Sequence, residues 1–245
     1  MSFAPVTLAG RSPGASLVLT CEHASPAVPP EFRALGLAAE QLRDHIGWDI
    51  GAASITEELS RQLGVPAVLS AASRLLVDCN RDLSDADLMP QESHGIAIPG
   101  NARIDSAERA ERLRRFYEPY HRAVDAVLAA HAGARLLSIH SFTPALNGQE
   151  RPFDVGVLFD AHGALADVLA RRIAATGLAV RMNEPYSALD GLIFSARSHG
   201  LCHHVPYLEL EVNNRLLRRD DEARAVARRL ADAVASLLDP PTGDR

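Results

Sequence analysis

Short apolar runs alternate along the chain with segments in which apolar residues recur every three or four positions. An apolar run bounded by turn residues is typical of a buried strand, and a period near 3.6 residues is typical of an amphipathic helix. Alternation of the two is typical of an α/β layer architecture. The pattern predicts strands at residues 16–21, 66–71, 74–78, 134–140, 154–160, 178–182 and 206–212. It predicts helices at residues 38–63, 105–131, 163–176 and 220–238.

Composition narrows the class of protein. The 245 residues are 47% hydrophobic and 23% charged, as in a globular protein, and no repeat or change in composition divides them. We therefore expect a single domain over residues 1–245. The formal net charge of −6 argues against a nucleic acid or an anionic membrane as the main partner, because both would repel the chain.

Location is predicted from what the sequence lacks. No segment approaches the roughly 20 apolar residues that span a bilayer. The first residues show neither the basic region nor the apolar run of a signal peptide. Three widely spaced cysteines fit a reducing compartment, so we expect a cytoplasmic protein.

Two histidines stand at the ends of predicted strands. His23 follows the run at residues 16–21, and His140 ends the run at 134–140. Ligands of open α/β sheets bind outside the carboxyl ends of the strands, so we expect the two histidines to share one site. Two histidines and a carboxylate, with water in the open position, are a common catalytic zinc set.

The third ligand is open between three residues. Asp49, in the segment HIGWDIGA, is the leading candidate, and Glu22 and His45 are the alternatives. If Asp49 were instead an ordinary helix residue, it would form a surface salt bridge.

A carboxylate on the last predicted strand is a candidate general base. Strand alternation puts Glu209 and Glu211 on the face opposite Leu208 and Leu210. A buried carboxylate is costly unless it is paired or used, and Glu211 is well placed to take a proton from a metal-activated water. The alternative is an edge strand whose polar face meets water.

The segment SRLLVDCNRDLSD (73–85) offers groups for a substrate carboxylate. Arg81 has the planar fork that binds a carboxylate through two hydrogen bonds, and Asn80 adds a neutral contact. A structural pair between this arginine and a nearby aspartate is the alternative. Arg74 and Arg197 are further candidates for a second carboxylate or for the oxyanion, and the loop that contains Tyr186 is expected to form a pocket wall.

Other catalytic classes lack support. Ser141 follows His140 but is not in a GxSxG elbow, which disfavours a serine hydrolase. There is no GxGxxG and no Walker A sequence, so dinucleotide and NTP binding are not predicted.

Seven sequence segments, which follow one another from residue 20 to residue 217, contain most of these candidate residues. They are TCEHASPAVP (20–29), HIGWDIGA (45–52), SRLLVDCNRDLSD (73–85), SIHSFTP (138–144), DVGVLFD (154–160), NEPYSALDGL (183–192) and LELEVNNRLL (208–217). Taken together, they resemble the N-formylglutamate amidohydrolase family.

The resemblance implies a three-layer α/β/α fold with a mixed, mostly parallel sheet, similar to zinc carboxypeptidases and aspartoacylase. It implies one zinc ion and hydrolysis of the N-acyl amide bond of a small N-acylated amino acid that carries a carboxylate. His23 and His140 look like the histidine ligands of those relatives, and Glu211 stands in the place of their general base. Asn80-Arg81 looks like the pair that holds the substrate carboxylate.

One departure concerns the third ligand. The carboxypeptidase and aspartoacylase pattern is His-x-x-Glu, and the residue three after His23 is Pro26. Two other functions stay open from the sequence: a non-catalytic carboxylate or metabolite binder on the same fold, and a metallopeptidase with another acyl or peptide substrate.

Overall fold

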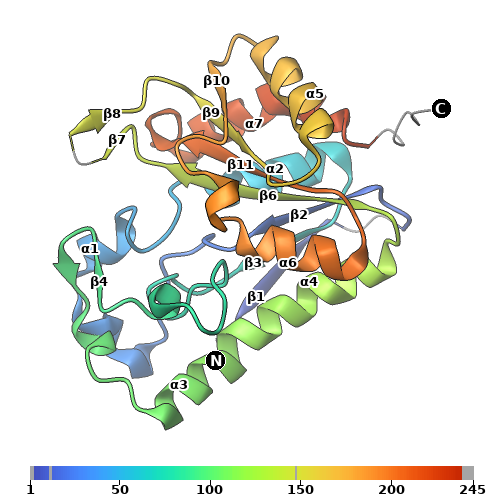
Figure 1. Ribbon diagram of the computed structural model, residues 1–245. Helices are drawn as coiled ribbons and strands as arrows, with labels where there is room; N and C mark the ends of the chain where they lie inside the picture. Colours follow the sequence, from blue (N-terminus) through green and yellow to red (C-terminus); the bar gives the residue numbers. More distant parts are fainter. Residues whose placement is uncertain (1–2, 11–12, 147, 239–245) are drawn as a thin grey trace.

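A computed structural model describes residues 3–10, 13–146 and 148–238 of the chain. A seven-stranded sheet runs through it in the order β1-β3-β2-β6-β11-β9-β10 (Figure 1). The strands are β1 Val6–Ala9, β2 Leu17–Cys21, β3 Ala67–Ser70, β6 Arg135–Phe142, β9 Val155–Leu158, β10 Val180–Met182 and β11 Tyr207–Asn213. Strands β3, β2, β6 and β11 are mutually parallel. Strand β1 is antiparallel to β3, and β9 is antiparallel to β11. Strand β10 is parallel to β9. The predicted mixed, mostly parallel sheet is confirmed.

Helices cover both faces of this sheet, which gives three layers (Figure 1). One apolar core joins one face to α2 Ala52–Leu63, α5 Gly163–Ala174 and α7 Asp220–Ala235. A second core joins the other face to α4 Glu118–Ala130 and α6 Phe194–His203. The three-layer α/β/α prediction is confirmed.

Shorter elements lie around the carboxyl edge of the sheet and at the helix ends. They are α1 Ala39–Arg43, the hairpin β4 Glu92–Ser93 with β5 Ile96–Ala97, and the hairpin β7 Ala145–Leu146 with β8 Gln149–Glu150. Helix α3 Ser106–Arg112 continues through a π-helical segment at Leu113–Tyr117 into α4, so the long predicted helix at 105–131 is confirmed. Short 3₁₀ segments lie at Pro30–Gly36, Ala86–Leu88, Pro99–Asn101, Ala188–Asp190 and Asn214–Leu216.

The single helix predicted at residues 38–63 is wrong. The segment forms α1 and α2, and residues 44–51 between them are a loop. Gly51 has a φ of +81°, and a side chain there would collide with Leu217, so the chain turns at this position. At Gly47 a Cβ would lie 2.1 Å from the Leu42 carbonyl oxygen. The break matters for function because it puts Asp49 on a loop at the sheet edge.

The strand predicted at residues 74–78 is also wrong. Leu75, Leu76 and Val77 are buried, yet they form a turn. Side chains, and not a neighbouring strand, bind the backbone carbonyls of Leu75 and Leu76: Asn101 Nδ2 donates to Leu75 O at 2.8 Å, and Arg112 Nη1 donates to Leu76 O at 3.1 Å. An apolar run signals burial, and burial alone does not distinguish a strand from a turn.

Candidate active site

A cavity of about 440 Å³ opens at the carboxyl ends of β2, β6 and β11. Its lining includes His23, Asp49, His140, Glu209 and Glu211, which come from three strand ends and one loop. The central strands are parallel, so their carboxyl ends bring together residues that are far apart in the sequence. This is the edge at which the two histidines were predicted to meet.

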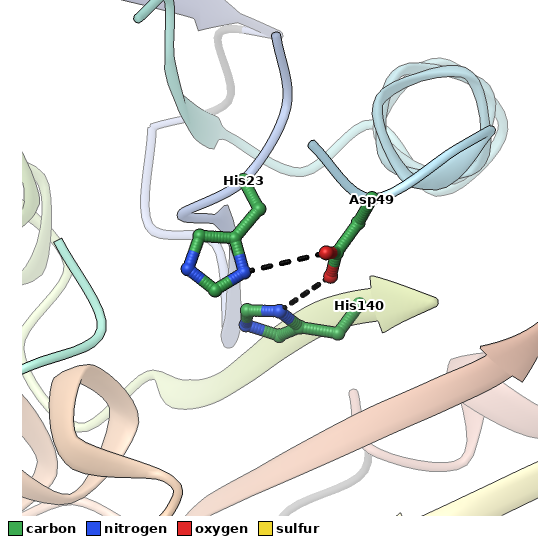
Figure 2. Close-up of side chains that lie close together, drawn as sticks. All are labelled: His23, Asp49 and His140. Carbon is green, nitrogen blue, oxygen red and sulfur yellow. Dashed lines mark hydrogen bonds and ion pairs between the residues drawn. The ribbon is translucent and has the colours of Figure 1, made fainter. Parts of the chain in front are cut away.

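Two imidazole rings share one carboxylate at the bottom of this cavity. His140 Nδ1 lies 2.8 Å from Asp49 Oδ2, and His23 Nδ1 lies 3.5 Å from Asp49 Oδ1 (Figure 2). The ring centroids are 4.7 Å apart, and all three residues are buried. One ligand atom from each falls within 4.8 Å of the others, a spacing that a single metal ion can bridge after small adjustments.

The opposite nitrogen of each ring is held by a second carboxylate. His23 Nε2 lies 2.7 Å from Asp78 Oδ1, and His140 Nε2 lies 2.9 Å from Glu22 Oε2. Metal-binding histidines commonly donate their other N–H to a carboxylate, which orients the ring and leaves the facing nitrogen free to bind the ion. Both rings here have that arrangement, with Nδ1 as the nitrogen that faces the shared site.

Glu22 is anchored beneath His140. Tyr120 Oη donates to its Oε1 at 2.7 Å, and Ser138 Oγ donates to its Oε2 at 2.5 Å. Burial alone would raise the pKa of Glu22, but hydrogen bonds from His140, Ser138 and Tyr120 lower it well below its ordinary value. Glu22 is therefore an ionised partner of the histidine, on the side away from Asp49.

The other alternative ligand, His45, lies at the mouth of the cavity. Its Nδ1 is 2.9 Å from Asp44 Oδ1, and its ring stacks edge-on against His94 with centroids 4.8 Å apart. Of the three candidates, Asp49 is the one whose carboxylate faces both Nδ1 atoms.

The charges around these rings favour a cation. Five carboxylates are buried here (Glu22, Asp49, Asp78, Glu209 and Glu211). Burial lowers the pKa of His140, but the carboxylates around it outweigh that effect and raise it well above the ordinary value. His23 Nδ1 is buried with no hydrogen-bond partner among the described residues. A divalent ion between the Nδ1 atoms and Asp49 would use this nitrogen and balance the negative charge, so the residues fit a metal.

Glu209 and Glu211 lie on the same face as His140. Strand β11 pairs with β6 in parallel register, with Glu211 opposite His140 and Glu209 opposite Ser138. β11 lies between β6 and β9 in the sheet, and both glutamates are buried, so the alternative of a water-facing edge strand is wrong. The predicted alternation is confirmed, because Leu208 and Leu210 belong to the core on the other face.

Burial governs the titration of both glutamates. It raises the pKa of Glu211 well above its ordinary value and, with the neighbouring Glu22, raises the pKa of Glu209 to about 7 against the pull of His140. Glu211 Oε2 has no hydrogen-bond partner among the described residues. Glu209 Oε2 lies 3.5 Å from both His140 Nε2 and Asn80 Nδ2. Glu211 is thus the carboxylate that is free to act on a molecule in the cavity.

Gly156 of β9 makes room for Glu211. The two residues are paired in the antiparallel register of β9 and β11. A Cβ at position 156 would lie 2.0 Å from the Glu184 carbonyl oxygen and 3.3 Å from Glu211 Cβ. A side chain here would therefore displace either the Glu184 loop or the glutamate.

The arginines of the segment 73–85 differ in what they are free to do. Arg74 pairs with Asp49 at 3.4 Å and with Asp78 at 2.8 Å, so it braces the carboxylates around the histidines. Arg81 lines the cavity, and among the described residues its guanidinium makes only long contacts, 3.7 Å to Asp85 and 3.4 Å to the Asn80 carbonyl. Of these two arginines, Arg81 therefore has more N–H donors available for an anion within the described part of the chain.

Asn80 connects the cavity wall to helix α6. Its Oδ1 accepts from the Ser195 backbone N–H at 2.9 Å, and its Nδ2 donates to the Leu192 carbonyl at 3.3 Å. The side chain lines the cavity and is almost wholly buried.

Of the two remaining predicted site residues, one lines the cavity and the other does not. Tyr186 lines the cavity, and Arg151 stacks over its ring at 5.0 Å. Arg197 is not among the cavity-lining residues, and its Nε pairs with Asp160 Oδ2 at 3.0 Å.

Three carboxylates received no role toward the rings from the sequence. The sequence suggested Glu22 only as an alternative metal ligand and Glu209 only as a residue on the same face as Glu211, and it gave Asp78 no role beyond that of one of the aspartates near Arg81. For Glu209, the alternation that identified Glu211 was a usable signal. For Asp78, no local sequence pattern indicated a contact with His23, which lies 55 positions earlier in the chain.

The fold and this site define an α/β protein with a buried His–His–Asp group suited to a metal ion. The chain belongs to the N-formylglutamate amidohydrolase family, whose model matches residues 15–218. The family is one of hydrolases, and the matched range contains the residues around the cavity. Curated proteins include no match to this sequence.

Two solved structures share the fold over nearly the whole chain. The gene product Atu2144 from Agrobacterium tumefaciens is 32% identical, with a TM-score of 0.88 and 96% of each chain covered. The N-formylglutamate amidohydrolase from Ralstonia eutropha JMP134 is 22% identical, with a TM-score of 0.72, and 96% of this chain and 98% of that chain are covered. In the described part of the present chain, no helix is long and apolar enough to cross a membrane.

Proposed function

We propose that this chain is a zinc-dependent amidohydrolase that cleaves the N-acyl amide bond of a small N-acylated amino acid carrying a carboxylate, such as N-formylglutamate. Family membership supports the reaction class. The observation that carries the metal proposal is the arrangement of His23 and His140, whose Nδ1 atoms face one carboxylate while their Nε2 atoms are bound by two others. A cavity of about 440 Å³ suits a small substrate.

His23, His140 and Asp49 are the residues that would hold the ion. Two imidazoles and a carboxylate, with room beside them in the cavity, are a donor set typical of catalytic zinc. When bound, zinc supplies Lewis acidity, which polarises a carbonyl and lowers the pKa of water.

Glu211 moves the proton. Its Oε2, which has no hydrogen-bond partner in the part of the chain that the structure describes, takes a proton from the attacking water and then delivers it to the leaving nitrogen of the amide. The raised pKa of Glu211 lets the carboxyl group hold the proton between the two steps. Burial on a central strand keeps the side chain in place and limits access of bulk water.

Arg81 and Asn80 position the substrate by its carboxylate. The Arg81 fork offers two parallel N–H donors, and Asn80 and Tyr186 also line the cavity and limit the space for the molecule. Fixing the substrate in this way lowers the entropic part of the activation barrier. Arg74 pairs with Asp49 and Asp78 and so helps to hold these two carboxylates against the histidine rings.

Metal removal tests this function directly. We expect the protein as purified to contain zinc, a chelator to abolish hydrolysis of N-formylglutamate, and added zinc to restore it. The measurements are elemental analysis and amine release from a panel of N-formyl, N-acetyl and peptide substrates. Undiminished activity after complete metal removal would rule out the metal mechanism. Ligand-induced thermal stabilisation without turnover of any substrate would identify a binding protein, and a preference for longer peptides would identify a peptidase.

Replacing Arg81 by alanine should raise KM about ten- to a hundredfold for a substrate with a free carboxylate, since charge-assisted hydrogen bonds are lost. The same substrate with its carboxylate converted to an amide should be affected much less. Arg197→Ala is the matched control, because it removes an arginine that pairs with Asp160 away from the cavity. Equal KM changes for both substrates in Arg81→Ala would give Arg81 a structural role.

A further inference from the structure

A second group of nitrogen, oxygen and sulfur ligands lies where α4 packs against α6, outside the cavity described above. It is built from Asp125 on α4 and from the segment HGLCHH (199–204) at the end of α6. None of these residues lines the active-site cavity. The proposed hydrolysis uses none of them.

Asp125 is the centre of this group. Its Oδ1 lies 2.8 Å from His199 Nδ1 and 2.9 Å from His203 Nε2. Single ligand atoms of Asp125, Cys202 and His203 all lie within 4.8 Å of one another. Ligands of one tetrahedral zinc ion are separated by roughly 3.5 Å, so small side-chain rotations would bring these three onto one ion.

His199 and His121 hold Asp125 in place from the buried side. His199 Nε2 lies 2.8 Å from His121 Nδ1, while its Nδ1 contacts the carboxylate. Burial, followed by the charge of His199, lowers the pKa of His121 to about 4, so its ring is neutral. Through these two contacts, His121 and His199 orient the Asp125 carboxylate as outer partners orient metal ligands.

The three ligands are accessible, unlike those of the active site. The side chains of Asp125 and His203 are 48% and 20% exposed, and Cys202 is exposed. Carboxylate, imidazole and thiolate from two helices form a mixed donor set that suits zinc and disfavours magnesium or calcium.

We propose that Asp125, Cys202 and His203 form a second site for a divalent transition-metal ion of borderline softness, with zinc as the natural occupant. Binding releases the Cys202 thiol proton to solvent and joins α4 to the end of α6. Helix α6 also provides the Ser195 N–H that holds Asn80, so the ion stabilises the helix that supports the cavity wall. The site does not depend on the proposed hydrolysis.

Cobalt titration of the full chain tests this proposal, because a thiolate bound to Co²⁺ gives a charge-transfer band in the near ultraviolet. We expect the band in the unmodified protein and in His140→Ala, which disables the active-site ligands. We expect no band in Cys202→Ser, and in His203→Ala a loss of cobalt affinity of about a hundredfold or more. His204→Asn is the matched control: it removes the neighbouring exposed imidazole, and asparagine tolerates the positive φ of 55° at that position.

Absence of the band in the unmodified protein would overturn the proposal. Persistence of the band in Cys202→Ser would also overturn it, since the thiolate would then be one of the buried cysteines, Cys21 or Cys79. Loss of the band in His140→Ala or in His204→Asn would contradict the assignment of the ligands. Cys202 is exposed, so its replacement by serine should leave the fold intact.

Discussion

Replacing Glu211 by glutamine should lower kcat for an N-acyl amino acid by about 10²–10⁴-fold, the usual effect of removing a general base. Glutamine keeps the shape of the side chain but accepts no proton from the attacking water. Bound metal should be unchanged, because the proposed ligand set of His23, His140 and Asp49 does not include this carboxylate; metal loss would instead favour the neighbouring group of His140, Glu209 and Glu211. Steady-state kinetics and elemental analysis of the same preparation measure both quantities.

Glu209→Gln is the matched control for this substitution. Glu209 lies two residues earlier on the same buried face of β11, but its carboxylate already contacts His140 and Asn80. We expect a smaller loss of kcat than in Glu211→Gln. Near-normal turnover in Glu211→Gln would refute its role, and a larger loss in Glu209→Gln would move that role to Glu209.

Replacing His140 by alanine should remove the active-site metal and reduce turnover to background. The substitution deletes one nitrogen of the proposed ligand set and leaves Glu22 and Asp49 without their shared partner. Loss of an outer carboxylate partner usually costs ten- to a hundredfold in metal affinity, and loss of a ligand should cost about a hundredfold or more. Zinc titration followed by kinetics on the zinc-loaded protein measures the effect.

His45→Ala is the matched control, because His45 is a histidine that lines the same cavity outside the proposed ligand set. It should keep the metal, since its Nδ1 is paired with Asp44 and not with the shared carboxylate. A circular dichroism spectrum would confirm that His140→Ala is folded. A folded His140→Ala protein with undiminished zinc affinity at the active site would exclude the proposed ligand set. Metal loss in His45→Ala would return His45 to the list of ligands.

Much of the site depends on local periodicity, and that part could be predicted. Strand alternation put Glu211 on the face opposite Leu210, and the apolar run before His23 indicated a strand end. Each of these inferences uses neighbours in the chain, whose relative positions follow from backbone geometry. The same reasoning failed for residues 74–78, because a continuous apolar run records burial and not backbone conformation.

By itself, the sequence determined the layer architecture, the two strand-end histidines and the face on which Glu211 lies. Only the tertiary structure decided that Asp49 faces both rings and that Asp78 holds His23. It also decided that Glu22 contacts His140 and not the adjacent His23. These contacts join residues up to 118 positions apart, and they depend on the paths of loops between strands. Periodicity along the chain carries no information about where such a loop returns, so the arrangement of the carboxylates around the histidines had to come from the folded molecule.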